Sequence, residues 1–284
     1  MTIALIGATG QLGTALAQRW AGDVVCLDHE QLDLADRQQV HSVLETLEPD
    51  TVVNAAAYNQ VDLAEQHPLT ACTVNALGPR YLTEYCAAHD VRLVHFSSDY
   101  VFGQDGSRDR PYTEQDLPGP ISAYGSSKLA GETFVQGGCP KHFVIRTCGL
   151  YGQASRPGGT NFVNTMLRLA AAGQPLRVVA DQYCTPTSTT SLADAVCQLL
   201  ETEQYGLYHA TNSGHTSWRE FARLIFELQG LQIEVQPITS DEFGAPARRP
   251  PYSVLDCSKL TGIIGGPLPT WQQALADHLQ RSQV

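Results

Sequence analysis

The feature that most constrains the fold is a glycine-rich loop between the first apolar run and an amphipathic helix. The run from Thr2 to Ile6 is almost unbroken, as expected of a strand covered on both faces, and Gly7-Ala-Thr-Gly10-Gln-Leu-Gly13 follows directly. Glycines at these spacings permit a tight turn and close approach of a pyrophosphate to backbone N–H groups at the helix N-terminus. The predicted dinucleotide contacts in this loop are Gly7, Thr9, Gly10, Gln11, Leu12 and Gly13.

Strand-like and helical segments then alternate as far as residue 150. Apolar runs at 24–27, 50–57, 91–97 and 142–146 are separated by helical patterns at about 36–47, 70–89 and 123 onward. Parallel strands need crossover helices, so this rhythm predicts an α/β fold with a doubly wound parallel sheet, the Rossmann arrangement. We expect residues 1–150 to form this dinucleotide-binding domain.

The pattern changes after residue 150. A Gly/Ser/Pro-rich segment (153–160), which we interpret as a mobile flap, precedes helical patterns at 161–172, 188–203, 217–229 and 269–282. Short strand-like runs lie at 176–180 and 206–210. We expect residues 151–284 to form a smaller, mainly substrate-binding lobe, with segments at about 180–210 returning to the first domain.

Charge and cysteine content exclude several classes of protein. The net charge is −11 and no basic cluster is present, which argues against binding to nucleic acid or an anionic membrane. No apolar run is long enough for a transmembrane helix. Eight scattered cysteines include no C-x-x-C pair, so we expect neither disulfides nor zinc, and a cytoplasmic location. The histidines and acids show no ligand spacing, so no metal site is predicted.

Asp28 directly follows the second predicted strand, where the adenosine ribose of a dinucleotide lies. A carboxylate there accepts hydrogen bonds from both ribose hydroxyls and repels a 2′-phosphate, so NADH is expected in preference to NADPH; a solvated loop acid is the alternative. Asn75, within the helical pattern 70–89, either faces the cleft or caps a local turn. Further candidate cofactor contacts follow the second and third strands: Asp33, Leu34, Ala55, Ala56, Ala57, Tyr58 and Asn59.

Tyr124 and Lys128 are the candidate proton-transfer pair. If Ser122 caps their helix, these residues are four apart and project from one face. A neighbouring ammonium favours phenolate, so we expect Lys128 to lower the pKa of Tyr124. Ser98, at the end of the fourth strand, supplies a hydroxyl for the oxygen that gains or loses the proton. The alternative is an ordinary pair on a helix surface.

Several longer motifs occur in order: GATGQLG, SSDYVF (97–102), YGSSKLAGE (124–132), GLYHATNSG (206–214) and ARRPPYSVLD (247–256). With them the chain resembles, over essentially its whole length, the extended short-chain dehydrogenase/reductases, and most closely the dTDP-4-dehydrorhamnose reductase family. The resemblance implies reduction of a nucleotide-activated 4-keto sugar by NADH or NADPH, in polysaccharide precursor synthesis. Ser98, Tyr124 and Lys128 would form the catalytic trio. It also implies that Phe96 contacts the dinucleotide and that Ser98 and Asp99 contact the substrate.

Two motifs depart from the family pattern. Its Arg-Thr-Ser-Trp-Val-Tyr is here Arg146-Thr-Cys148-Gly149-Leu-Tyr151, and its Arg-Pro-x-Asn-Ser is here Arg249-Pro-Pro-Tyr252-Ser253. Both lie on the substrate side, so we expect a retained reaction with an altered sugar or nucleotide. Arg249 is the candidate for the diphosphate, because guanidinium binds phosphate oxygens bidentately, although a surface arginine is the alternative. Gly149 and Asn161 are further candidate substrate contacts.

Two other functions remain open at this stage. A sugar-nucleotide epimerase of the same superfamily keeps its NAD bound and shows no net redox change. A non-catalytic NAD(P)-binding regulatory subunit is the second alternative, against which the intact Ser98, Tyr124 and Lys128 set argues. The expected partner is a small-molecule nucleotide sugar. The oligomeric state is not readable from the chain, and a homodimer is one option.

Overall fold

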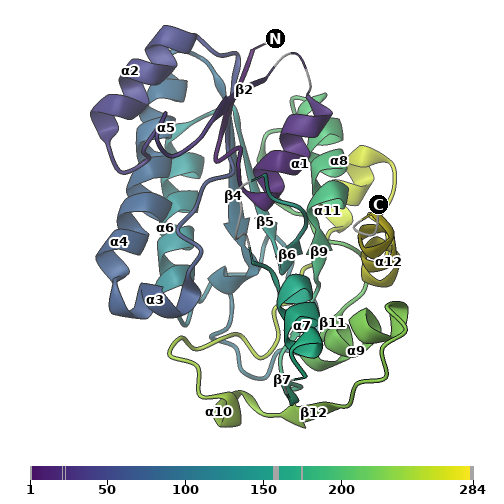
Figure 1. Ribbon diagram of the computed structural model, residues 1–284. Coiled ribbons are helices and arrows are strands. Elements are labelled where there is room, and N and C mark those ends of the chain that lie inside the picture. Colours follow the sequence, from purple (N-terminus) through teal and green to yellow (C-terminus); the bar gives the residue numbers. More distant parts are fainter. Residues whose placement is uncertain (1, 21, 23, 156–159, 174, 282–284) are drawn as a thin grey trace.

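The computed structural model describes residues 2–20, 22, 24–155, 160–173 and 175–281 (Figure 1). Its centre is a six-stranded sheet in the order β10-β5-β4-β3-β1-β2, and all neighbouring strands are parallel. The strands are β1 (Ile3–Ile6), β2 (Val24–Leu27), β3 (Thr51–Asn54), β4 (Arg92–Ser98), β5 (His142–Thr147) and β10 (Gly206–His209). The predicted doubly wound α/β sheet is confirmed.

Helices cover both faces of this sheet. One face packs against α1 (Gln11–Arg19), α8 (Thr189–Leu200) and α11 (Ser258–Ile264). The other packs against α2 (Arg37–Leu47), α5 (Gly78–Ala88) and α6 (Ala123–Gly138). All four residues of β1 are buried, which is why its sequence is an unbroken apolar run.

The region between β3 and β4 differs from the expected helix at 70–89. It consists of α3 (Val61–Gln66), α4 (Pro68–Cys72), a π-helical turn (Thr73–Leu77) and then α5. Pro68 lies in the first turn of α4, where the missing N–H costs nothing, whereas Pro79 directly follows the π-helical turn, whose helical backbone continues into α5. The wide turn contains Asn75, and π-turns of this kind are frequent at functional sites.

A second core forms the lobe, most of which lies in the lower part of Figure 1. Its helices are α7 (Phe162–Ala171), α9 (Trp218–Leu228), α10 (Ser240–Phe243) and α12 (Trp271–Arg281). Its strands pair two by two: β6 (Leu150–Tyr151) with β9 (Thr187–Ser188), β8 (Tyr183–Cys184) with β11 (Thr216–Ser217), and β7 (Leu176–Val179) with β12 (Val235–Ile238). Between these pieces the chain returns to the main sheet through α8 and β10.

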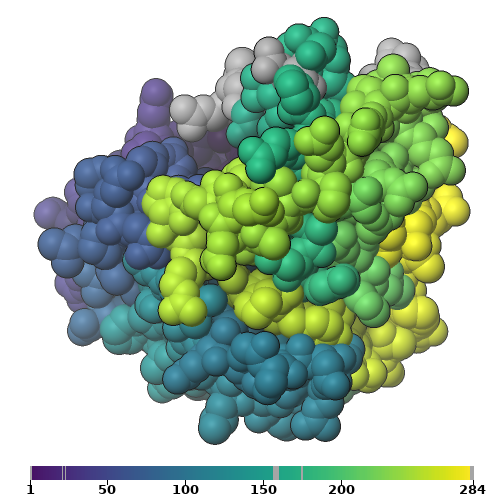
Figure 2. Space-filling view, turned by 90° about the horizontal axis from the view of Figure 1, so that it is seen from below, coloured from purple at the N-terminus to yellow at the C-terminus, as the bar shows by residue number. Residues whose placement is uncertain are grey.

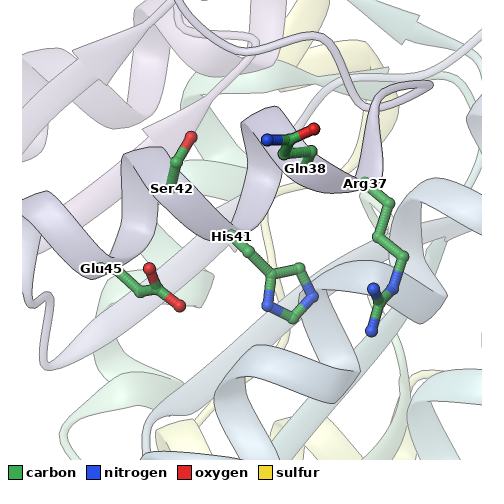
Figure 3. A pocket seen from close by; sticks show the side chains of 5 residues that line it. All are labelled: Arg37, Gln38, His41, Ser42 and Glu45. Carbon is green, nitrogen blue, oxygen red and sulfur yellow. The ribbon is translucent and has the colours of Figure 1, made fainter.

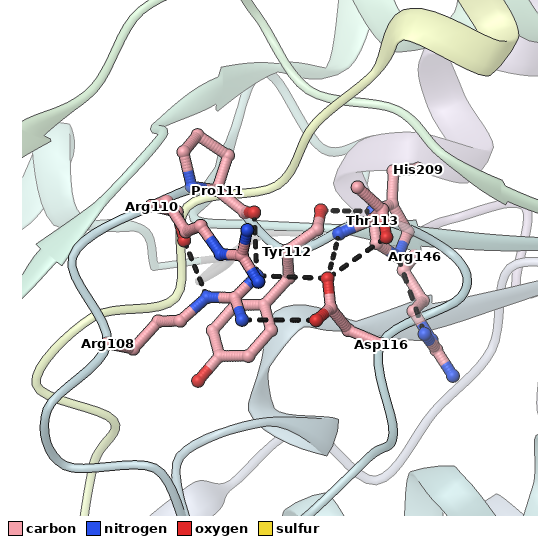
Figure 4. A network of polar contacts seen from close by, with 8 residues as sticks. All are labelled: Arg108, Arg110, Pro111, Tyr112, Thr113, Asp116, Arg146 and His209. Carbon is pink, nitrogen blue, oxygen red and sulfur yellow. Dashed lines mark hydrogen bonds and ion pairs between the residues drawn. The ribbon is translucent and has the colours of Figure 1, made fainter.

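The segment after β4, expected to be loop, is ordered by a polar network (Figure 4). The Arg108 guanidinium donates to both carboxylate oxygens of Asp116, at 3.1 and 2.9 Å, and lies over the Tyr112 ring. The His209 ring lies 3.0 Å from the Tyr112 carbonyl oxygen. The network therefore fixes this segment against β10, at one end of the sheet.

The eight cysteines are all free thiols, and four of them are buried. Cys26, by contrast, is exposed on the edge strand β2. Among the described residues, no helix is both long and apolar enough to span a membrane.

Candidate active site

The glycine loop between β1 and α1 has the geometry of a phosphate cradle. Gly7 adopts a left-handed φ of 77°, and a Cβ there would lie 2.7 Å from the Ala56 backbone nitrogen. A Cβ on Gly13 would overlap the Gly7 carbonyl oxygen, so α1 can approach β1 only with glycine at this position. Gly10 is the N-cap of α1 and supplies no side-chain cap. The first-turn N–H groups of the helix are thus left for an anion, which fits the pyrophosphate of a dinucleotide.

Ser98 and Tyr124 come from different elements and meet at the carboxyl edge of the sheet. Ser98 ends β4, and Tyr124 lies in the first turn of α6, which begins after Ser122 as predicted: the Ser122 hydroxyl accepts a hydrogen bond from Gly125 N–H at 3.1 Å. The Ser98 hydroxyl lies close enough to the Tyr124 phenol to lower the pKa of that phenol. The ring of Tyr100 packs edge-on against that of Tyr124, with centroids 5.8 Å apart.

Burial raises the pKa of Tyr124 to about 12, and the neighbouring Ser98 hydroxyl opposes this rise only in part. The predicted lowering of this pKa by Lys128 is wrong for the structure described here, because desolvation outweighs every charge nearby. A phenol with this pKa is fully protonated at neutral pH. It therefore suits the acid in a reduction, which must arrive with its proton.

Lys128 lies one turn along α6 from Tyr124 and is 2% exposed. Its ammonium donates to the Phe96 carbonyl oxygen at 2.7 Å, so Phe96 meets the site through its backbone. Burial lowers the pKa of Lys128 to about 8, against an opposing effect of Glu132. A buried ammonium with unused donors is suited to binding ribose hydroxyls.

Asn75 holds the end of β3 in place. Its amide accepts from Tyr58 N–H at 2.8 Å and donates to the Tyr58 carbonyl oxygen at 2.9 Å. It also donates to the Ser127 hydroxyl at 3.0 Å, and that hydroxyl donates to the Tyr124 carbonyl oxygen at 2.7 Å. The structure therefore gives the Asn75 side chain protein partners, linking β3 to the start of α6. Ala57 and Asn59 remain exposed beside Tyr58.

The candidates on the adenosine side lie on the turns after β2. The Asp28 carboxylate accepts from the N–H groups of Glu30 and Gln31, both at 3.0 Å, through one oxygen. Asp33 likewise accepts from Ala35 N–H at 2.9 Å. Each carboxylate keeps a second oxygen that has no hydrogen bond within the described residues. Leu34 is 3% exposed and packs into the core.

Gln11 joins the glycine loop to the lobe. Its side-chain oxygen accepts from the Asn161 amide at 2.8 Å and from Gly152 N–H at 2.9 Å. Asn161 is also the N-cap of α7, accepting from Asn164 N–H at 2.9 Å. The structure thus places Asn161 between the two candidate ligand sites. The predicted mobile flap (153–160) includes residues 156–159, which lie outside the described residues.

Residues 1–284 match the family described as RmlD substrate binding domain. The chain belongs to this family. It is 40% identical to a dTDP-4-dehydrorhamnose reductase of Sinorhizobium fredii, over 96% of this chain and 95% of that protein. The crystal structure of a dTDP-4-dehydrorhamnose reductase from Clostridium acetobutylicum has a TM-score of 0.94 at 38% identity, over 100% of both chains. The Bacillus anthracis dTDP-4-dehydrorhamnose reductase, solved with NADP, has a TM-score of 0.93 at 36% identity, over 99% of this chain and 100% of that chain.

The first departure from the RmlD family pattern has a steric cause. Gly149 has a left-handed φ of 54°, and a Cβ there would lie 3.2 Å from both the Pro186 Cα and the ring of Trp218. The indole of Trp218, from α9, therefore lies against the position where the family pattern has its own tryptophan. The second departure, Tyr252, packs against the apolar cluster of Val101, Phe102, Tyr112 and Leu255, with its phenol near Arg108.

Arg249, the candidate for the diphosphate, forms an ion pair within the protein. Its guanidinium donates to both oxygens of Asp62, at 3.0 and 2.9 Å, and to the Ala247 carbonyl oxygen at 3.0 Å. Asp62 belongs to α3, so this ion pair fastens the segment 245–251 to the main domain. Figure 2, seen from below, shows that segment (yellow-green) crossing between the blue and green parts of the chain.

Sequence reasoning missed some residues of this site. Ser253 donates to the Asp99 carboxylate at 2.6 Å, although 154 positions separate them. Buried Glu132 pairs with Arg146, a partner of opposite charge that α6 and β5 bring together. Its place eight residues after Tyr124, on the same face of a helix, was the available signal.

One surface hollow lies apart from Tyr124. A hollow of about 560 Å³ is lined by side chains of a single helix, α2: Arg37, Gln38, His41, Ser42 and Glu45 (Figure 3). It contains none of the candidate site residues. Within the described part of the chain, no group of three or more His, Cys, Asp or Glu side chains is arranged to hold a metal ion.

Proposed function

We propose that the protein is an NAD(P)H-dependent reductase that converts the C4 ketone of a nucleotide-activated hexose to an alcohol. The observation that carries the proposal is the meeting of Ser98, Tyr124 and a buried Lys128 at the sheet edge that also holds the glycine loop. The dTDP-4-dehydrorhamnose reductases among its relatives make dTDP-4-dehydrorhamnose the first substrate to test.

Each residue then has a chemical role. Tyr124 gives its proton to the carbonyl oxygen, and its raised pKa keeps that proton available at neutral pH. Ser98 holds the oxygen in place, and Lys128 binds ribose hydroxyls and stabilises the phenolate left on Tyr124. The reduced nicotinamide, when bound, supplies the hydride for the carbonyl carbon. The lobe (151–284) binds the nucleotide sugar, and the domain of residues 1–150 holds the dinucleotide, in contact with the predicted cofactor residues.

NADH is the proposed dinucleotide, on the basis of Asp28. One oxygen of its carboxylate is free of hydrogen bonds from the described residues and stands at the end of β2, where it would oppose a 2′-phosphate. The relative from Bacillus anthracis was solved with NADP, so the preference requires its own test. Comparing KM for NADH and NADPH in the wild type and in Asp28→Ser decides it: the variant should gain affinity for NADPH.

The assay follows nicotinamide absorbance with purified protein, dTDP-4-dehydrorhamnose and NADH. Tyr124→Phe should lower kcat by about 10²- to 10⁴-fold, because the acid is removed while the ring remains. Tyr81→Phe, a half-buried tyrosine on α5, is the matched control and should keep full turnover. Failure of the wild type to oxidise NADH with this or related 4-keto sugars would count against the proposal.

An epimerase would behave differently in the same assay. It retains its dinucleotide through each turnover, so added NADH would not be consumed in proportion to product. Oxidation of one NADH for each ketone reduced therefore separates the two activities.

We place the protein in the cytoplasm, because its free thiols suit the reducing conditions there. Whether the protein forms a homodimer is tested by light scattering.

A further inference from the structure

A buried carboxylate links the candidate catalytic serine to a distant segment of the chain. Asp99 follows Ser98 directly and is 2% exposed. One of its oxygens accepts the Ser98 hydroxyl at 3.0 Å, and the other accepts the Ser253 hydroxyl at 2.6 Å. Ser253 belongs to the loop before α11, so a hydrogen-bonded chain runs from this loop through Asp99 to the site.

Backbone hydrogen bonds hold Ser253 in place independently of its side chain. Its N–H donates to the Tyr183 carbonyl oxygen at 2.9 Å, and Tyr183 N–H donates to the Pro251 carbonyl oxygen at 2.9 Å. The next residue, Val254, accepts from Tyr112 N–H at 2.8 Å. The Ser253 hydroxyl is therefore presented to Asp99 by a fixed backbone, and removing the hydroxyl should leave that backbone intact.

We propose that Ser253 is a positioning residue of the reaction, which acts through Asp99 to orient the hydroxyl of Ser98. The proposal rests on the role of Ser98 in the proposed function. A serine hydroxyl carries one proton, and that proton is directed to Asp99. The Ser98 oxygen accordingly accepts, taking a hydrogen bond from Tyr100 N–H at 3.1 Å. The contacts with Asp99 and Tyr100 thus fix the Ser98 oxygen beside Tyr124, and its hydroxyl turns from Asp99 to the carbonyl oxygen when a ketone is bound.

The ionisable groups that face Asp99 are Tyr100 next to it, Tyr124 from α6 and the Cys148 thiol after β5. Burial raises the pKa of Asp99, and the hydrogen bonds from Ser253, Cys148 and Ser98 oppose that rise, with Ser253 making the largest contribution among them. Removing the Ser253 hydroxyl should therefore raise the pKa of Asp99 further. A protonated Asp99 no longer holds the Ser98 proton, so activity should be lost at a higher pH than in the wild type.

The test compares Ser253→Ala with Ser253→Thr in steady-state assays across pH. In Ser253→Ala we expect kcat to fall about tenfold with KM for both substrates nearly unchanged, as for an interaction that matters in the transition state. The acid limb of the kcat profile should move to higher pH. Ser253→Thr keeps the hydroxyl and should restore both values. Asp99→Asn should abolish the acid limb, and thermal unfolding checks that each variant is folded.

Ser213→Ala is the matched control, because it removes a hydroxyl that donates to the Leu268 carbonyl oxygen at 2.7 Å, away from Asp99. It should leave kcat and its pH profile unchanged. The proposal is overturned if Ser253→Ala keeps the wild-type kcat and acid limb. It is also overturned if Ser213→Ala lowers kcat as much as Ser253→Ala does. In that case Tyr124→Phe would still be inactive, so the proposed function survives; a wild type without turnover overturns both.

Discussion

Lys128 is the residue through which pH is expected to act on this protein. Its ammonium is held under the site by the Phe96 carbonyl oxygen, 2.7 Å away, and it is almost fully enclosed. Because burial disfavours the charged form, the pKa of Lys128 falls from 10.5 to about 8. The ammonium that we propose binds the ribose hydroxyls therefore exists below this pH and is lost above it.

We predict that kcat/KM for the dinucleotide falls as pH rises through about 8, the value at which free Lys128 loses its proton. Tyr124 cannot cause this limb, since its pKa of about 12 keeps it protonated. Lys128→Arg, whose charge persists, should lose the alkaline limb even though its overall activity is lower. A wild-type profile that stays level through this pH, measured with saturating sugar nucleotide, would contradict the assignment.

Single residues also mark the limit of prediction from sequence. Tyr124, Lys128 and Ser122 were placed correctly on one helix because their relation is local, set by helical spacing. The residue type of Arg249 predicts an anionic partner, and its guanidinium is paired with Asp62, 187 positions away, while contact with a diphosphate stays a prediction. The residue type suggests an anion as partner, but only the tertiary fold determines which anion lies within reach.

At the scale of elements, α6 organises the site through one face. Tyr124, Lys128 and Glu132 are spaced by four residues along it. Glu132 is 0% exposed and Arg146 is 2% exposed, and the guanidinium donates to the carboxylate at 2.9 and 2.7 Å. This bidentate pair fastens α6 to β5 directly beneath the catalytic face.

We predict that Glu132→Ala lowers the free energy of unfolding by about 3–5 kcal/mol, because it leaves the Arg146 charge buried without a partner. Glu84→Ala, which removes a partly exposed carboxylate paired with Arg37 and Arg80, should cost less than about 1 kcal/mol. Urea denaturation measures both. Equal losses of unfolding free energy in the two variants would show that the buried ion pair stabilises the fold no more than the exposed one does.

Elements were predictable where their pattern was long and periodic. Strands β2 and β5 and helices α2 and α9 lie within a residue or so of their expected bounds. The helix expected at 70–89 instead has an irregular start, because Asn75 bonds the Tyr58 backbone and the chain widens into a π-turn to reach it. The strands of two residues in the lobe are too short for alternation to show, and their pairing depends on partners far along the chain.

At the scale of the whole molecule, the chain builds one sheet and then returns to it. Strand β10 becomes the edge strand beside β5, and α8 packs on α1, so the lobe is attached through several crossings. The clearest polar link between the glycine loop and the lobe is the hydrogen bond between Gln11 and Asn161. It joins the start of α1 to the start of α7. Binding of a dinucleotide at the glycine loop should therefore change the affinity of the lobe for its ligand.

We predict that this hydrogen bond couples the two ligand sites, so that NADH raises the affinity for dTDP and the reverse. Asn161→Asp keeps an oxygen to cap α7 but loses the donor to Gln11, so it should weaken the coupling while α7 stays folded. Calorimetric titration of dTDP with and without NADH measures the effect, and we expect the several-fold enhancement in the wild type to be largely lost.

The control for this coupling is Thr239→Ala, which removes a helix cap in the lobe far from Gln11 and should leave the enhancement intact. Gln11→Ala also loses the hydrogen bond from Gly152 N–H, so it should weaken the coupling at least as much as Asn161→Asp. The double variant should lose no more than Gln11→Ala alone, because the bond between Gln11 and Asn161 is already absent there. Losses that add in the double variant would show that Gln11 and Asn161 act separately. The lobe would then communicate with the glycine loop by packing rather than through this contact.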